Sequence, residues 1–236
     1  MSLSSQVLQY VLSGLVVGGI YALIGLGFVI VYSVTRVINF AQGEFVMLGA
    51  LLMVTLGGQD APLPLAFLLA LSAVSGIGAL LERVAIHPVR RASVLTLIII
   101  TIGASISLRG AALLVWGTDP FALPPFSPGP PLQLGGAILV RQGLWVLAVA
   151  LAIFVGLWVF FTRTYLGKAV RACAINPRAA RLMGIRVDRM SLLAFGLAGG
   201  LGAAAGIVIA PITYATYDMG LMLGLKGSWL PCSAVL

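Results

Sequence analysis

Residues 7–34 have the sequence VLQYVLSGLVVGGIYALIGLGFVIVYSV, in which no side chain carries a charge. Apolar runs of about 18 residues or more are candidates for helices that cross a bilayer. A helix satisfies its own backbone hydrogen bonds, so such a run can sit in lipid without water. This stretch therefore predicts a membrane-spanning helix near the start of the chain.

The same pattern recurs along the chain. Further apolar runs lie at Glu44–Leu56, Leu63–Leu81, Val94–Trp116, Leu144–Phe161 and Ser191–Ile212, with a last one from Met219 onward. Because Glu44–Leu56 is too short to cross alone at about 1.5 Å per residue, we interpret it as the second half of a broken helix that begins near Tyr32. Barrel strands would alternate apolar and polar residues, which these runs do not. We predict an all-α, polytopic transmembrane bundle of about six to seven helices, forming a single domain over residues 1–236.

The overall composition supports a membrane location. The chain is 61% hydrophobic and only 8% charged, whereas a soluble domain carries roughly 25% charged residues. A surface so poor in charge would not stay in water, and a lipid bilayer is the environment that solvates it.

The basic residues gather in two connections. Three lie in residues 82–93 and seven in residues 162–190, namely Arg83, Arg90, Arg91, Arg163, Lys168, Arg171, Arg178, Arg181, Arg186 and Arg189. The connections 57–62 and 117–141 contain one basic residue, Arg141. Cytoplasmic loops of membrane proteins carry an excess of Lys and Arg. We therefore place both basic loops in the cytoplasm and the Pro-rich stretch 120–131 outside, and we do not attribute the net charge of +8 to nucleic-acid binding.

The side of the N-terminus depends on the number of crossings before Leu63. Two passes over residues 7–57 would place the N-terminus outside. Three passes, using a break at Gly18–Gly19, would place it in the cytoplasm. The short N-terminal tail carries no Lys or Arg, so the sequence leaves both arrangements open.

A polar segment interrupts the apolar pattern at Asn39, Gln42, Gly43 and Glu44. An ionisable side chain at membrane depth costs about 2.5–3.5 kcal/mol on insertion scales, so Glu44 needs a compensating partner or an aqueous position. One interpretation is a short cytoplasmic turn, with Glu44 in the first turn of a helix. The other is a discontinuous helix in which these four residues line a substrate path.

The loop 162–190 is too long and too basic for a simple connection. Pro177 follows Asn176, and Gly184 comes two turns later, which are ordinary start and stop signals of a helix. We predict a short surface helix whose apolar face carries Ala179, Leu182 and Met183. It could rest on anionic lipid or serve as a docking helix for a soluble partner, and we favour docking.

Small residues recur in the next apolar run. Gly196 and Gly200, and then Gly202 and Gly206, are each four residues apart. Such spacings let helix backbones approach closely in lipid. Packing within the chain and packing against another subunit both fit this pattern.

Three of these segments resemble a known family, the LivH-like permease subunits of bacterial ABC importers for branched-chain amino acids. They are residues 18–32, which begin with GGIYALIGLG, residues 38–49 with INFAQGEFVMLG, and residues 167–211. The resemblance implies a permease in the bacterial cytoplasmic (inner) membrane that assembles with a second permease, two ATPase subunits and a periplasmic substrate-binding protein.

The resemblance also implies residues for ATPase docking. They are Gly167, Arg171, Arg178, Ala179, Ala180 and Gly184, within the cytoplasmic loop 162–190. Arg178 stands where the family's Glu-Ala-Ala-x-x-x-Gly motif has Glu, so the contact at that position differs. A second departure is the end of the chain, where Pro231 and Cys232 follow a family-like GLMLGLKG; this suggests a truncated or frameshifted end.

The expected function is translocation of branched-chain or related hydrophobic amino acids, with urea or short amides as alternative substrates. No Gly-rich phosphate loop occurs in the sequence, so we expect no cofactor and assign ATP hydrolysis to the partner subunits. We expect no enzymatic activity, since His87 is the only histidine and no His/Cys/Asp cluster is evident. A stand-alone channel or secondary carrier is the main rival. It should have ion-coupling carboxylates in its spans, where Glu44 and Asp218 are the acidic residues nearest a span.

Overall fold

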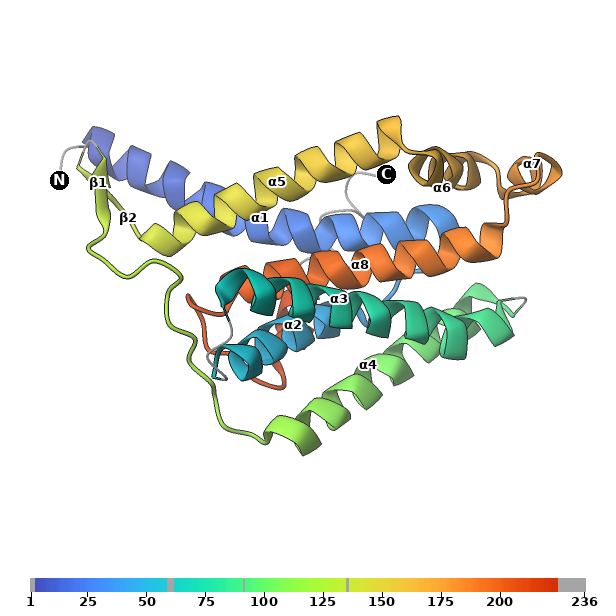
Figure 1. Ribbon diagram of the computed structural model, residues 1–236, viewed down its shortest axis with the longest axis horizontal. Helices are drawn as coiled ribbons and strands as arrows, with labels where there is room; N and C mark the ends of the chain where they lie inside the picture. Colours follow the sequence, from blue (N-terminus) through green and yellow to red (C-terminus); the bar gives the residue numbers. More distant parts are fainter. Residues whose placement is uncertain (1–2, 59–61, 91, 135, 225–236) are drawn as a thin grey trace.

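The computed structural model describes residues 3–58, 62–90, 92–134 and 136–224. Its α-helices are α1 (Leu3–Thr35), α2 (Gln42–Gly57), α3 (Leu63–Leu81), α4 (Val94–Trp116), α5 (Arg141–Arg163), α6 (Tyr165–Ile175), α7 (Pro177–Leu182) and α8 (Val187–Ile209) (Figure 1). A π-helical turn (Glu82–Ile86) and a 3-10 turn (His87–Val89) extend α3. A small antiparallel hairpin pairs β1 (Leu132–Leu134) with β2 (Ala137–Leu139).

Five of these helices are long and apolar enough to cross a membrane: α1, α3 with its extension, α4, α5 and α8. The predicted all-α bundle is therefore confirmed, with the β1–β2 hairpin as a small addition. The bounds of α3 and α4 coincide with the predicted runs, and α5 and α8 differ from theirs by a few residues at the ends. A helical segment also starts at Met219 and reaches the last described residue, Gly224.

Helix α8 forms the centre of the bundle. It packs most extensively against α3, α2 and α1, and most of its surface is buried, whereas α4 and α5 leave most of theirs exposed. In Figure 1, α4 lies apart from α1 and α5 on the far side of α2 and α3. The exposed faces of α4 and α5 are apolar, with Ile106, Leu114, Leu151 and Trp158 among them, as expected for surfaces that meet lipid or another subunit.

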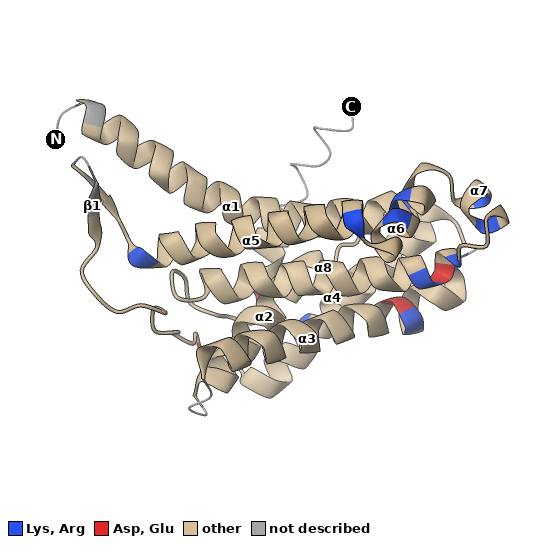
Figure 2. Cartoon of the chain, turned by 45° about the horizontal axis from the view of Figure 1, so that its top comes forward, with Lys and Arg blue, Asp and Glu red and all other residues tan. Residues whose placement is uncertain are grey.

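The two ends of the bundle differ in charge. Lys and Arg gather at one end, around the end of α3, the end of α5, α6, α7 and the start of α8 (Figure 2). The first residues of α1 lie at the other end, where Gln9 binds the backbone of Ile138 in β2 through both amide atoms, at 3.0 and 2.6 Å. Since α1 runs unbroken through Gly18 and Gly19, it crosses once. Of the two arrangements that the sequence left open, this single crossing fits the two-pass arrangement, for which the positive-inside bias predicts an N-terminal end outside.

The second crossing is only half helical. The prediction that a broken helix begins near Tyr32 is wrong, because α1 continues to Thr35 and Tyr32 belongs to the first crossing. The chain then returns through the non-helical residues 36–41 before α2 starts at Gln42. Arg36 makes the reversal in a left-handed conformation with φ of 59°. This supports the prediction that Glu44–Leu56 is one half of a discontinuous crossing.

The glycines of α8 serve packing within the chain. A Cβ on Gly199 would come within 2.6 Å of the Val74 carbonyl oxygen in α3, and a Cβ on Gly202 within 2.7 Å of the Phe45 Cβ in α2. Gly206 is tighter still, because its Cβ would collide with the Val46 carbonyl oxygen. Of the two explanations for the glycine spacing, the structure supports backbone contact inside the subunit.

We expect Gly206→Ala to destabilise the protein by about 1–3 kcal/mol, the usual effect of overpacking a tight contact. Gly156→Ala is the matched control, since Gly156 has open space around it on α5. That control should be neutral or slightly stabilising, because alanine favours a helix by about 1 kcal/mol over glycine. Thermal unfolding in detergent compares the two, and equal midpoints would contradict the contact between α2 and α8.

Candidate substrate site and docking face

The first turn of α2 lies at the middle depth of the bundle. The Gln42 side-chain amide donates to the carbonyl oxygen of Ala198 at 3.0 Å, and Ala198 is the middle residue of α8. The non-helical segment before it is held by side chains: Asn39 Oδ1 accepts from the Ala41 N–H at 3.1 Å, and Thr101 Oγ1 accepts from the Phe40 N–H at 3.4 Å. These contacts supply partners for backbone groups that the broken helix frees.

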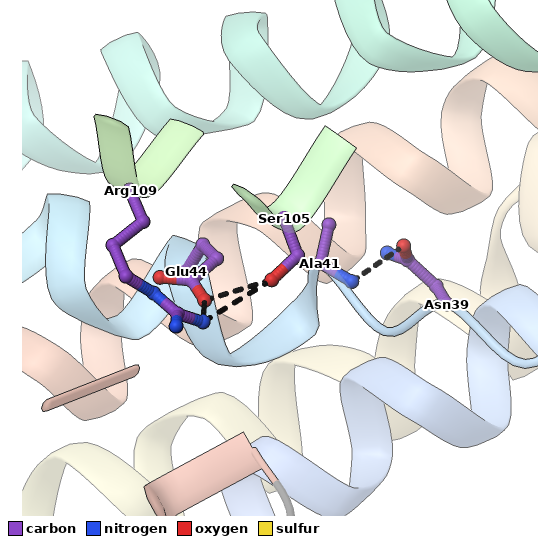
Figure 3. Close-up of polar contacts among 5 residues, drawn as sticks. All are labelled: Asn39, Ala41, Glu44, Ser105 and Arg109. Carbon is purple, nitrogen blue, oxygen red and sulfur yellow. Dashed lines mark hydrogen bonds and ion pairs between the residues drawn. The ribbon is translucent and has the colours of Figure 1, made fainter. Parts of the chain in front are cut away.

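An ion pair stands beside this turn. Glu44, in the first turn of α2, accepts from the guanidinium of Arg109 at 2.6 Å and from the hydroxyl of Ser105 at 2.9 Å (Figure 3). Both partners come from α4, of which Ser105 is the middle residue. Glu44 is 1% exposed. The positive end of α2 and Arg109 together offset the cost of placing this carboxylate at membrane depth.

The pair lines a cavity of about 300 Å³, the lower end of the range of roughly 300–1,000 Å³ for ligand pockets. Apolar side chains form most of its wall, and the helical segment after Met219 contributes backbone. The lining residues are Phe28, Phe40, Glu44, Ile102, Ser105, Ile106, Arg109, Gly220, Leu221 and Gly224. Ile102 and Ile106 are also exposed on the outside of α4, so the cavity borders a face that the described residues leave uncovered.

Of the four residues predicted for the substrate path, only Glu44 lines this cavity. Asn39 and Gln42 are fully buried and their side chains bind backbone groups, as described above. Gly43 is a packing residue: a Cβ there would collide with the carbonyl oxygen of Gly220. Asp218 is exposed, whereas Glu82 is 2% exposed at the basic end of α3.

Arg109 and Ser105 are site residues that the sequence analysis missed. A signal was available, because Arg109 is the one charged side chain in the apolar run Val94–Trp116. A charge inside a span marks a functional or paired position by default. Which acidic residue would pair with it depends on how α2 and α4 meet, and the sequence does not give that contact.

The predicted surface helix is present as α7. Asn176 caps it by accepting from the N–H groups of Arg178 and Ala179 at 3.0 and 3.1 Å. Gly184 ends it in a left-handed conformation with φ of 80°, which lets the Ile185 N–H reach the Ala180 carbonyl at 3.0 Å. Pro177 and Gly184 therefore have structural roles as the start and stop of this helix.

Helix α7 extends beyond the basic end of the bundle (Figure 1) and exposes apolar side chains there. Leu182 is 89% exposed and Met183 83% exposed, and Ile175 at the end of α6 is equally open. We call Ile175, Ala179, Leu182 and Met183 the α7 face. Large apolar side chains this exposed beside arginines mark a surface that meets something else.

The predicted docking residues divide into two groups. Arg171, Arg178, Ala179 and Gly184 are exposed. Ala180 is 4% exposed and packs inward, and a Cβ on Gly167 would collide with the carbonyl oxygen of Phe160. Gly167 and Ala180 therefore hold the loop in shape, and only the first group offers a surface.

Cys173 in α6 is the buried thiol of this loop. It is 1% exposed, and burial raises its pKa. Because the thiolate is the reactive form, we expect a maleimide to leave Cys173 unmodified in the folded protein until the pH is well above neutral. In a Cys232→Ser background, Ala179→Cys provides an exposed thiol for comparison, and rapid labelling of Cys173 itself would contradict its burial.

A second cavity, of about 590 Å³, lies between this loop and the core. Pro177 and Arg181 of the loop line it, together with Arg36, Glu82 and Asp188. Arg90 forms an ion pair with Asp188 across its edge. Arg36 also donates to the carbonyl oxygen of Ala174 at 2.8 Å, which ties the reversal between α1 and α2 to the end of α6.

A multi-pass bundle with a broken crossing, a polar site at middle depth and an exposed basic loop has the form of a membrane permease subunit. The family model described as "Branched-chain amino acid transport system / permease component" matches residues 10–228. The chain belongs to this family, and the resemblance predicted from the sequence is confirmed.

Curated relatives extend the match. The chain is 31% identical to the high-affinity branched-chain amino acid transport system permease protein BraD of Pseudomonas aeruginosa, over 93% of this chain and 76% of that protein. LivH of Escherichia coli gives the same identity and coverage. The autoinducer 2 import system permease protein LsrC of an Enterobacter species is 31% identical over 92% of this chain and 58% of its own length. No solved structure matches. The prediction for the C-terminal end falls within residues 225–236, outside the described residues.

Proposed function

We propose that this chain is the translocation subunit of an ATP-driven importer for branched-chain or related hydrophobic amino acids in the bacterial cytoplasmic membrane. It would work with a second permease, cytoplasmic ATPase subunits that hydrolyse the ATP, and a periplasmic substrate-binding protein. The observation that carries the proposal is the combination, in one chain of this family, of a cavity at middle depth with a Glu–Arg pair on its wall and an exposed apolar helix face at the basic end.

Loop 162–190 is the proposed ATPase-docking segment, with the α7 face as its contact surface. A push on α7 would reach the core through α6, because Arg36 binds the carbonyl oxygen of Ala174. Arg36 begins the segment 36–41 that leads to Glu44. The second cavity leaves room beside this connection. The route joins the docking face to the site at Glu44.

The uncovered faces of α4 and α5 fit the second permease. Ile102 and Ile106 border the Glu44 cavity and face outward, so a partner on α4 would close its open side. Helix α8 and the helices α1, α2 and α3 packed against it form the core of the subunit.

The test is uptake of radiolabelled L-leucine into proteoliposomes that hold this chain with its ATPase, second permease and binding protein. We expect uptake that needs ATP and stops when the ATPase is omitted. Uptake of equal rate without the ATPase would favour the stand-alone carrier. ATP-dependent uptake of urea or acetamide in place of L-leucine would support the assignment as an importer but with a different substrate.

A further inference from the structure

The Glu44–Arg109 pair is incompletely satisfied. The two side chains share one contact, from an Arg109 terminal nitrogen to Glu44 Oε1. Glu44 Oε2 and Arg109 Nε are buried, and neither has a hydrogen-bond partner among the described residues. Buried polar atoms are almost always paired, and Arg–carboxylate pairs are often bidentate. The pair therefore stands on a cavity wall with one mutual contact and two covered polar atoms whose hydrogen-bonding capacity is unused.

The free carboxylate oxygen points to the Gly220 side of the cavity. A Cβ on Gly220 would lie 2.7 Å from Glu44 Oε2, so a larger residue there would occupy the space beside this oxygen. Gly220 and Gly224 both line the cavity. Beyond this polar corner the wall is formed by Phe28, Phe40, Ile102, Ile106 and Leu221.

This arrangement selects among ligand types. A cation without an anion would meet Arg109, and an anion without a cation would meet Glu44. A neutral amide brings no charge to either side chain, so it gains nothing from the pair beyond the contact that Glu44 and Arg109 already share. A zwitterion with its charges on one carbon can place its ammonium on Glu44 and its carboxylate on Arg109, while an apolar side chain lies along the isoleucine and phenylalanine wall.

We propose that this cavity binds the zwitterionic head group of an apolar α-amino acid, with Glu44 holding the ammonium and Arg109 the carboxylate. Ser105, which donates to Glu44, positions the Glu44 carboxylate. When no ligand is bound, Glu44 and Arg109 neutralise each other through their mutual contact. The inference rests on the proposed function, because it takes this cavity as part of the transport path.

The test measures binding of radiolabelled L-leucine to the permease–ATPase complex in lipid nanodiscs without the binding protein, so that the signal belongs to the membrane site. Isoamylamine, which lacks the carboxylate, and isocaproate, which lacks the ammonium, are the competitors. L-Leucine should compete better than either by on the order of tenfold to a hundredfold, the effect of one charged hydrogen bond.

The variants should change the preference as well as the affinity. Glu44→Gln should weaken L-leucine by on the order of tenfold to a hundredfold and make isocaproate the better competitor. Arg109→Gln should weaken L-leucine binding by a similar factor and make isoamylamine the better competitor. The double variant Glu44→Gln/Arg109→Gln keeps a neutral pair of similar size, so it remains informative if a single variant fails to co-purify with the ATPase.

The results separate the inference from the proposed function. Unchanged L-leucine binding by the double variant would overturn the head-group site, as would single variants that lose affinity for all three ligands equally. Wild-type complex that binds no L-leucine here, while the complete importer transports it, would also overturn the site and leave the function intact. Failure of the complete importer to transport L-leucine would instead refute the proposed function.

Discussion

Leu182→Asp removes capture of the ATPase by the permease in a detergent pull-down; this is the result we expect if the α7 face is the docking surface. Leu182 is 89% exposed, so the substitution changes no contact within the subunit. At an interface it would lose the buried leucine and place a charge in an apolar contact, an effect of about 2–4 kcal/mol for a hot-spot position, or roughly thirtyfold in affinity at the least.

Two controls separate loss of docking from loss of folding. Leu182→Met keeps an apolar side chain and should retain capture. Ala180→Asp, by contrast, would bury a charge in the loop, since Ala180 is 4% exposed, so its effect would report on the loop's structure. Thermal unfolding of Leu182→Asp should match that of the unsubstituted chain.

The competing interpretation of α7 is a helix that rests on anionic lipid. In that case Leu182→Asp would leave capture of the ATPase intact and would reduce binding of the loop to anionic vesicles. Retained capture with an unchanged midpoint of unfolding would therefore refute the docking proposal for this face.

The sequence predicted the spans well because lipid imposes one simple requirement on them. A run such as Leu63–Leu81 must be long, apolar and helical wherever it packs, and α3 has those bounds. The start and stop of α7 were also predictable, since Asn176, Pro177 and Gly184 act through local backbone geometry. Features that depend on residues close together in the sequence could therefore be predicted from it.

The site was only partly predictable because it depends on how helices pack. Glu44 stood out as a charge near a span, but its partners Ser105 and Arg109 lie more than 60 residues away, at separations of 61 and 65. The glycines of α8 were ambiguous for the same reason: Gly202 meets α2 and Gly199 meets α3, and spacing alone does not name the opposing helix. Asn39, Gln42 and Gly43 share the polar segment with Glu44 but face packed backbone.

Arg109→Leu should be the most destabilising single substitution of the site, by about 3–5 kcal/mol, because it leaves the Glu44 carboxylate buried without its counterion. Glu44→Gln/Arg109→Leu removes both charges and should recover most of that loss. Thermal unfolding in detergent, followed by circular dichroism, measures the series. Arg163→Leu is the control, since Arg163 is exposed at the end of α5, where surface substitutions usually stay within about 0.5 kcal/mol.

The double variant carries the argument, because the cost of a single variant includes the charge it strands. If the two substitutions acted independently, the double variant would be less stable than the unsubstituted chain by the sum of the two single destabilisations. Recovery instead means that Glu44 and Arg109 mainly neutralise each other across their 2.6 Å contact and add little net stability to the fold. A protein that folds as well without either charge has no structural need for them. Their presence at middle depth would then be explained by a ligand that carries both charges.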